Sequence, residues 1–165
     1  AAPAPVRTTT PAPSPAAVRL GRLSLEWVGG GYLANGGTGD DVVTVADVDA
    51  SSAARDRRRA TFIAVRGLAD PQCFSFRTGD GRYLRHYELD GYTSAFASSQ
   101  IFREDATYCP RPGVTADSVM LRSFNYPDFF LRWDGTRFGI GYFKDTEEFR
   151  TASSFRVRAG LARTV

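Results

Sequence analysis

The sequence holds very little of several residue types, and each scarcity removes a class of function. Lys144 is the only lysine, His86 is the only histidine, and there are two cysteines. Neither cysteine lies in a Cys-x-x-Cys or Cys/His spacing, which argues against the common zinc and thiol-redox motifs. No apolar run approaches the ~20 residues of a transmembrane helix. We therefore expect a soluble protein with no membrane partner.

Motifs for catalysis and for metal binding are missing as well. No Gly-x-Ser-x-Gly nucleophile elbow is present to work with His86, and nothing places two carboxylates at the separation that glycoside hydrolysis needs. The acidic residues between positions 40 and 49 hint at calcium. An EF-hand loop starting at Asp47 would, however, put Ser52 at the obligatory glycine and Arg58 at the bidentate glutamate. We expect no catalytic residue, no metal and no cofactor.

Positive charge is gathered in one short run. The formal net charge is only +3, and residues 55–59, Arg-Asp-Arg-Arg-Arg, form the one basic cluster. A nucleic-acid-binding surface would carry more such charge, interleaved with aromatic residues. We predict that residues 55–59 form a solvated surface turn and that the protein binds no nucleic acid.

The two cysteines, Cys73 and Cys109, are an even count and permit one disulfide. If they pair, the bridge closes a long loop, which stabilises the fold by roughly 3 to 4 kcal/mol through the entropy of the unfolded chain. Such a bond is not maintained in a reducing cytosol. A pairing would therefore indicate a secreted, extracellular protein.

The first residues have the composition of a linker. Residues 1–17 hold five of the nine prolines together with Ala, Thr and Ser, a mixture that forms no core and favours extended, flexible chain. The stretch lacks the charged start and apolar segment of a signal peptide. We interpret residues 1–19 as a disordered tail or linker, the start of a mature chain or a piece of a larger protein, and residues 20–165 as one domain.

The rest of the chain repeats itself. Gly67, Gly113 and Gly160 follow similar segments at spacings of 46 and 47 residues. Apolar residues alternate with polar ones, as in residues 73–77 and 82–86, which predicts strands separated by Gly-, Asn- and Asp-rich turns. The pattern gives three repeats of about 47 residues, over residues 20–70, 71–117 and 118–165.

Three β repeats predict an all-β fold, a β-trefoil. A propeller needs four or more blades, whereas a threefold barrel with a hairpin cap closes with three repeats and leaves no exposed edge. Aromatic residues at matching positions, such as Phe62, Tyr108 and Phe155, should then pack in the core. We expect one short helical turn near residues 49–57, capped by Asp49 or Ser51.

The middle repeat resembles a known family. Residues 81–86 read Gly-Arg-Tyr-Leu-Arg-His, residues 102–108 read Phe-Arg-Glu-Asp-Ala-Thr-Tyr, and residues 123–127 read Ser-Phe-Asn-Tyr-Pro. These segments are similar to the "GRYLRH", "FxxDATF" and "SxNYPxxYLRH" motifs of the arabinofuranosidase B-type carbohydrate-binding domain, the family 42 binding modules. The resemblance covers about residues 20–162.

The resemblance implies a β-trefoil with one shallow pocket per repeat, each able to hold one arabinofuranose unit. The motif histidine and aspartate that line the pocket correspond to His86 and Asp105. Asp105 would accept hydrogen bonds from sugar hydroxyls, and His86 would add a hydrogen bond and a ring edge. Neighbouring Tyr87 or Tyr92 would supply an apolar wall.

The other two repeats depart from the motif. Asn35 and Arg59 occupy the histidine and aspartate positions of the first repeat, and Trp133 and Ala152 occupy those of the last. Loss of the aspartate removes most of the binding free energy of a weak sugar site. We therefore expect one working pocket, with Trp133 leaving open a stacking site in the last repeat.

Three functional hypotheses follow. The leading one is non-catalytic binding of arabinofuranose side chains of arabinoxylan or arabinan by a monomeric domain, free or attached to a glycoside hydrolase. The alternatives are a protein-binding or inhibitory trefoil with degenerate sugar pockets, and a part of an α-L-arabinofuranosidase. A lone histidine is more often structural, so it is its pairing with Asp105 that favours the first hypothesis.

Overall fold

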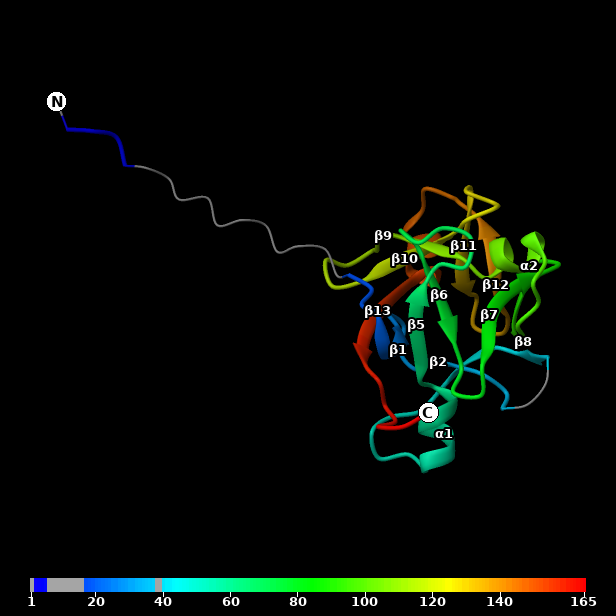
Figure 1. The fold of residues 1–165 in the computed structure, drawn as a ribbon. Helices are drawn as coiled ribbons and strands as arrows, with labels where there is room; N and C mark the ends of the chain where they lie inside the picture. Colours follow the sequence, from blue (N-terminus) through cyan, green and yellow to red (C-terminus); the bar gives the residue numbers. More distant parts are fainter. Residues whose placement is uncertain (1, 6–16, 38–39) are drawn as a thin grey trace.

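The chain is an all-β structure with short helices. The computed structural model describes residues 2–5, 17–37 and 40–165, and in this part of the chain thirteen strands join in one sheet. Figure 1 shows the arrangement. The strands are β1 (Gly21–Trp27), β2 (Tyr32–Ala34), β3 (Asp41–Val42), β4 (Thr44–Ala46), β5 (Phe62–Arg66), β6 (Phe74–Arg77), β7 (Arg82–Tyr87), β8 (Asp90–Ala95), β9 (Tyr108–Pro112), β10 (Val119–Ser123), β11 (Phe129–Trp133), β12 (Phe138–Tyr142) and β13 (Ser154–Ala159). The helices are α1 (Ala54–Arg59), α2 (Gln100–Asp105) and α3 (Glu147–Ala152).

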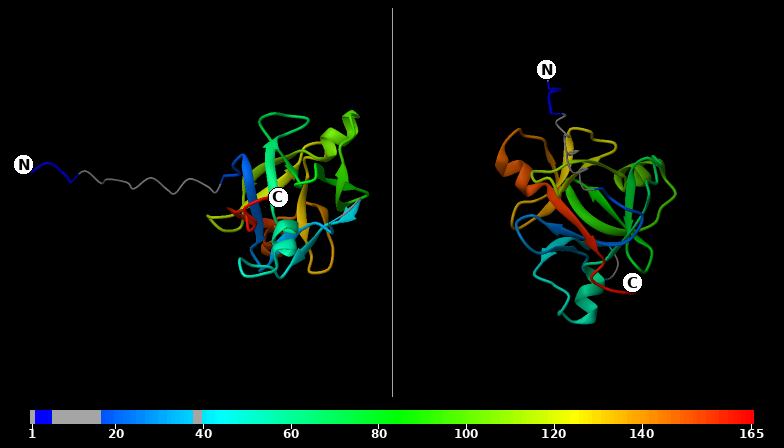
Figure 2. Two further views of the ribbon diagram at one scale, coloured as in Figure 1. Left: turned by 60° about the horizontal axis from the view of Figure 1, so that its bottom comes forward. Right: turned by 90° about the vertical axis from the view of Figure 1, so that its left-hand side faces the viewer.

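Antiparallel strand pairing closes a barrel. The ring runs β1–β5–β6–β9–β10–β13 and back to β1. The hairpins β2–β4, β7–β8 and β11–β12 lie outside this ring. Residues 20–70, 71–117 and 118–165, called here the first, middle and last third, occupy three sectors around a common centre in the right-hand view of Figure 2. A closed ring leaves its strands no free edge.

The apolar alternation of the barrel strands fills the interior. In β5, Phe62 and Ala64 are 0% and 1% exposed, and the residues between them are less buried. Phe62, Tyr108 and Phe155 are all fully buried, so the prediction that these aromatic residues form the core is confirmed. Each occupies the same place after the helix of its third.

The short helix predicted near residues 49–57 is present, although it lies a few residues later and its caps differ. Helix α1 begins at Ala54, its N-cap is Ala53, and it has no side-chain cap. The predicted caps are therefore wrong; Asp49 instead accepts a hydrogen bond of 2.7 Å from the backbone N of Ser51. Residues 55–59 lie at the surface as predicted, since α1 has no buried residue, but they form most of this helix rather than a turn. Helices α2 and α3 were not predicted, since six residues are too few to show a 3.6-residue period.

A hydroxyl after each helix joins neighbouring thirds. Thr107 Oγ donates to the Arg103 carbonyl at 2.7 Å and accepts from the backbone N of Ala69 at 3.0 Å. Thr61 and Ser154 make the same two contacts after α1 and α3, with Ala162 and Val114 as donors. Each third is thus hydrogen-bonded to the next in a closed cycle.

The structure contains the predicted disulfide. Cys73 and Cys109 are joined across a sequence separation of 36 residues, beside the pairing of Phe74 with Tyr108 between β6 and β9. Of the predicted N-terminal tail, residues 1 and 6–16 lie outside the described residues. Val18 is 7% exposed and packs within the main core cluster, two residues ahead of the boundary predicted at residue 20. No described helix has the length and apolar character to cross a membrane.

Candidate functional site

His86 and Asp105 lie against each other. His86 is in β7, where Arg82, Leu84 and His86 are the buried alternate residues, and Asp105 is the last residue of α2. His86 Nε2 is 3.6 Å from Asp105 Oδ1, and the two side chains are 4% and 8% exposed. The imidazole and the carboxylate are therefore adjacent and largely removed from water.

Asn125 and Ser123, from the last third, fix this pair. Asn125 Nδ2 donates to Asp105 Oδ1 at 2.8 Å, and Asn125 Oδ1 lies 3.0 Å from His86 Nε2. Ser123 Oγ lies 3.2 Å from the same Nε2 and donates to Asn125 Oδ1 at 3.1 Å. Because an amide oxygen only accepts, Nε2 of His86 carries the proton and donates it to Asn125.

The second oxygen of Asp105 faces Arg85. Arg85 Nη2 donates to Asp105 Oδ2 at 3.4 Å. The guanidinium carbon of Arg85 lies 5.3 Å from the ring centre of Phe102 and 5.4 Å from that of Tyr87. A carboxylate has about four acceptor positions. Among the described residues, Asn125 and Arg85 are the side-chain donors to Asp105, so acceptor capacity remains for the hydroxyls of a ligand.

Burial lowers the pKa of His86 below its ordinary value of 6.5, because removal from water disfavours the charged ring. The hydrogen bond to Asn125 and the charge of Asp105 act in the opposite direction, and the charge of Arg85 adds to the lowering. At neutral pH the ring is therefore neutral. This agrees with its role as a single-proton donor in the network.

The lowered pKa predicts a dependence of stability on pH. The unfolded state takes up the histidine proton at higher pH than the folded state does. The contribution of His86 to the free energy of unfolding is therefore fully present above pH 6.5 and is lost as the pH falls toward the folded-state pKa. Urea denaturation between about pH 7 and about pH 5 should show this decrease. The variant His86→Gln should have a smaller slope in that window. Equal slopes for the two proteins would contradict the assignment.

A cavity opens beside the pair. Its volume is about 510 Å³, within the range of about 300 to 1,000 Å³ that is usual for small-ligand sites. One wall is aromatic: the ring of Tyr126 lies 5.5 Å from the His86 ring and 6.0 Å from Phe129. The lining residues of this middle cavity are Arg85, His86, Tyr87, Glu88, Leu89, Ile101, Asp105, Tyr126, Phe129 and Ile140.

Of the other predicted residues, Tyr87 lies where it was expected and Tyr92 does not. Tyr87 lines the middle cavity and is 54% exposed. Tyr92 lies on β8, paired with Arg85 of β7 and Val42 of β3, and is not among the lining residues. Its predicted place in the wall is taken by Tyr126. Trp133 lies on β11 and lines a different cavity.

Sequence reasoning missed Asn125, Ser123 and Tyr126 as site residues. They belong to the Ser-Phe-Asn-Tyr-Pro segment at residues 123–127, which the sequence pattern assigns to the last third. The segment comprises the last residue of β10 and most of the turn before β11, and it reaches across to the middle third. The motif could have indicated that these residues belong to a site, but the sequence does not show that they contact His86 and Asp105 of the middle third.

Cavities also occur at the two positions where the motif is lost. The first cavity, about 480 Å³, is lined by Asn35, Gly37, Arg55, Arg58, Arg59, Thr78, Gly79, Asp80, Arg82 and Val165. The last cavity, about 540 Å³, is lined by Trp27, Trp133, Asp134, Gly135, Glu147, Glu148, Thr151 and Ala152. The last cavity joins residues of two thirds, as the middle cavity does, and the first cavity joins residues of the first and middle thirds with Val165 of the last third. The fold therefore keeps the three hollows and varies their chemistry.

The family follows from comparison with known proteins. The family model described as the Alpha-L-arabinofuranosidase B (ABFB) domain matches residues 29–157. The chain belongs to this family. An arabinofuranosidase/B-xylosidase of Trichoderma koningii is 32% identical over 139 residues, which are 79% of this chain and 27% of that protein. Alpha-L-arabinofuranosidase B of Aspergillus niger is 37% identical over 89 residues, 53% of this chain and 18% of that protein.

Solved structures agree with this ABFB assignment. A crystal structure of an arabinofuranosidase complexed with arabinofuranosyl-alpha-1,2-xylobiose has a TM-score of 0.78 and 29% identity, covering 90% of this chain and 33% of that chain. The ABFB chain thus spans about a third or less of these relatives. The BEL β-trefoil, at 12% identity, has a TM-score of 0.64 over 87% of this chain and 96% of that chain, which is a likeness of fold alone.

Proposed function

We propose that the chain is a non-catalytic module that binds arabinofuranosyl side chains of plant polysaccharides through the middle cavity. The observation that carries the proposal is the buried carboxylate of Asp105, which retains acceptor capacity at a cavity with an aromatic wall. Charged acceptors and aromatic rings are the two features that a sugar, polar at its hydroxyls and apolar on its ring faces, requires.

Each wall of the cavity has a separate role in this proposal. Asp105 accepts hydrogen bonds from ring hydroxyls, and His86 and Asn125 hold it in place. Tyr126, which is 49% exposed, covers the apolar face of the furanose ring, and Tyr87 stands at the rim. Because one pocket gives no multivalent gain, binding by the middle cavity alone is weak, near millimolar, which corresponds to about 4 kcal/mol.

The finer architecture belongs to the same proposal. We infer that the three thirds are three repeats of a β-trefoil, supported by the closed cycle of hydrogen bonds between them and by the likeness to the BEL β-trefoil. The disulfide favours an oxidising, extracellular location. The chain acts as a monomer that directs an attached glycoside hydrolase to its substrate. A catalytic part of an arabinofuranosidase, or a protein-binding trefoil, is the competing function.

An NMR titration tests the sugar-binding function. His86 is the only histidine, so its ring signals report on the middle cavity without overlap. Methyl α-L-arabinofuranoside at tens of millimolar should shift the His86 ring signals and the side-chain amide of Asn125, whereas methyl β-D-xylopyranoside should shift them much less. Absence of any shift with the arabinoside would refute the proposal, and release of 4-nitrophenol from a chromogenic arabinofuranoside would support the catalytic alternative.

The last cavity offers a second sugar site of different character. Trp27 and Trp133 both line it, and they are the only two tryptophans. Trp27 Nε1 donates to the Thr151 carbonyl at 3.0 Å, which holds its ring beside α3. Stacking on such rings is worth about 0.5 to 1.5 kcal/mol beyond the buried area for aromatic partners, so we propose a weak stacking site for a neutral sugar.

Tryptophan fluorescence reports on this cavity alone. Titration with arabinan oligosaccharides should change the emission of the wild type, and Asp105→Asn should leave that change intact because Asp105 lies in the middle cavity. Trp133→Ala should abolish the response while Trp27 still emits. An unchanged response in Trp133→Ala would contradict the stacking site.

A further inference from the structure

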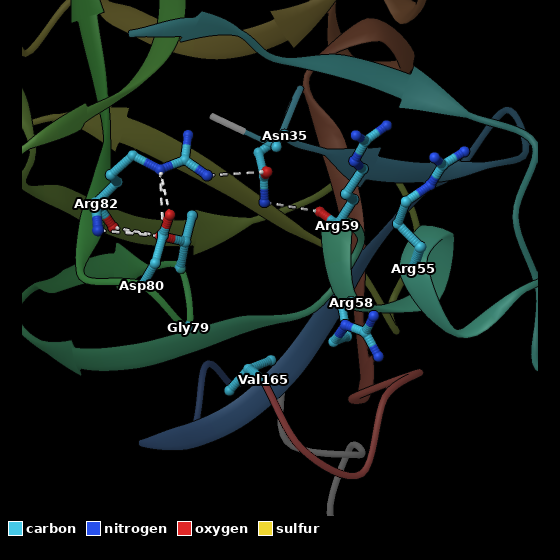
Figure 3. Close-up of a pocket in the computed structure, with 10 residues that line it drawn as sticks. Asn35, Arg55, Arg58, Arg59, Gly79, Asp80, Arg82 and Val165 are labelled. Carbon is cyan, nitrogen blue, oxygen red and sulfur yellow. Dashed lines mark hydrogen bonds and ion pairs between the residues drawn. The ribbon is translucent and has the colours of Figure 1, made fainter. Parts of the chain in front are cut away.

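The first cavity differs from the other two in its charge. Four arginines line it against one aspartate, Asp80. Figure 3 shows Arg55 and Arg59 extending from α1 on one side and Asp80 and Arg82 on the other, with Asn35 between them. No feature of the proposed arabinofuranose site accounts for this concentration of guanidinium groups.

Arg82 has a structural role at this site. It is 7% exposed, and its guanidinium forms ion pairs with Asp41 at 2.7 Å and with Asp80 at 3.0 Å. It also donates to Asn35 Oδ1 at 3.3 Å. A buried arginine that is paired in this way is neutralised locally, so Arg82 and the two aspartates form a fixed polar wall whose formal charge is −1.

The arginines of α1 lack, in the described part of the chain, the close ion pairs that Arg82 makes. Among the described residues, Arg58 and Arg59 form no ion pair with an acidic side chain, and Arg55 has one long contact of 3.7 Å, to Asp56. The Arg59 backbone is held in place, because its carbonyl accepts from the backbone N of Asn35 at 3.0 Å and from Asn35 Nδ2 at 3.1 Å. On this side the cavity is therefore lined by the guanidinium groups of Arg55, Arg58 and Arg59, which have no acidic side chain closer than 3.7 Å among the described residues.

Arg59 occupies the position in the first third that Asp105 occupies in the middle third. Arg59 is the last residue of α1, as Asp105 is the last residue of α2, and Asn35 stands where the middle third has His86. The first cavity thus has nearly the volume of the middle cavity, about 480 Å³ against about 510 Å³, with the carboxylate exchanged for a guanidinium. A guanidinium donates hydrogen bonds and never accepts them, and its planar fork matches a carboxylate.

We propose that the first cavity binds a carboxylate-bearing sugar, a hexuronate unit, with Arg59 and Arg55 as the donors to its carboxylate. The cavity holds one ring, Arg59 and Arg55 meet the charge, and the wall of Asn35, Arg82 and Asp80 faces the hydroxyls. A nucleic acid fits less well, because it would need basic and aromatic residues spread along an extended track. This inference goes beyond the proposed arabinofuranose binding and does not depend on it.

The test is a set of NMR titrations with D-glucuronate, D-glucose, sodium acetate and inorganic phosphate. Glucuronate should shift the backbone amides of α1 and the side-chain amide of Asn35, with an affinity that weakens as salt is raised. Glucose and acetate should each bind at least about tenfold more weakly, because each provides only half of the recognised groups. Phosphate or a single-stranded oligonucleotide binding at least as tightly as glucuronate would overturn the proposal in favour of a general anion site.

Variants locate the site and separate it from the middle cavity. Arg59→Gln should reduce glucuronate affinity at least about tenfold, and Arg55→Gln should reduce it less, because Arg55 is more exposed. Arg111→Gln, at an exposed position on β9, is the matched control and should bind as the wild type does. If Arg59→Gln fails to fold, Arg55→Gln still decides the question. Asp105→Asn should leave glucuronate binding unchanged, so failure of the arabinofuranose site and failure of this site are distinguishable.

Discussion

Replacing Asp105 by asparagine is expected to lower the affinity for an arabinofuranoside by about 10- to 100-fold. A hydrogen bond to a charged group contributes about 1.5 to 3 kcal/mol, and each 1.4 kcal/mol is a factor of about ten in affinity. The substitution keeps the size of the side chain and leaves an oxygen that can accept from Asn125. The loss therefore reports the charge itself, measured as the dissociation constant from the shifts of the His86 ring signals.

Asp128→Asn is the matched control for this experiment. Asp128 is exposed in the turn before β11, close in sequence to Tyr126 of the same cavity, and its substitution changes the net charge by the same amount. It should bind as the wild type does. Equal affinities for Asp105→Asn and the wild type would show that the carboxylate plays no part in sugar binding. The proposed role of Asp105 in the middle cavity would then be wrong.

Removal of the disulfide is expected to be the largest single loss of stability. The variant Cys73→Ala/Cys109→Ala opens a loop with a separation of 36 residues, and the entropy gained by the unfolded chain lowers the free energy of unfolding by roughly 4 kcal/mol. Both cysteines are buried, at 7% and 5% exposure, so alanine is preferred to serine because it introduces no buried hydroxyl. Urea denaturation of the wild type and the variant measures the difference.

Chemical reduction provides the control for the substitutions. Wild-type protein unfolded in the presence of a reductant should lose a similar amount of stability, whereas the alanine variant should not respond to the reductant. A difference in unfolding free energy below about 1 kcal/mol would mean that native strain or structure in the unfolded chain cancels the loop-closure effect.

The three cavities show how one scaffold carries different chemistries. At the end of α1, α2 and α3 stand Arg59, Asp105 and Ala152, each beside a hollow of similar size. At all three places a backbone N–H of one third donates to a side-chain hydroxyl of the next, so this contact between thirds does not depend on the residue that lines the hollow. The three cavities therefore differ in chemistry through a few side chains on a shared backbone frame.

Several features could be predicted from the sequence because they rest on local or periodic patterns. The alternation in residues 73–77 and 82–86 is a property of strands alone, and the spacing of Gly67, Gly113 and Gly160 predicts three repeats. The short helices could not be predicted, since six residues give no helical period and only Ser99 and Thr146 mark their starts as side-chain caps. Ala53 before α1 carries no such signal.

The sequence by itself predicted the all-β class from strand alternation and the Cys73–Cys109 disulfide from the presence of two cysteines. It also identified His86 and Asp105 as candidates, because their motifs are local features of the chain. Only the tertiary structure decided that Asn125 and Tyr126 complete the site of the middle third, and that Trp27 joins Trp133. Each cavity includes residues of a neighbouring third, so its residues meet only when the barrel closes. Contacts of that kind depend on the packing of the whole chain, and no local pattern specifies them.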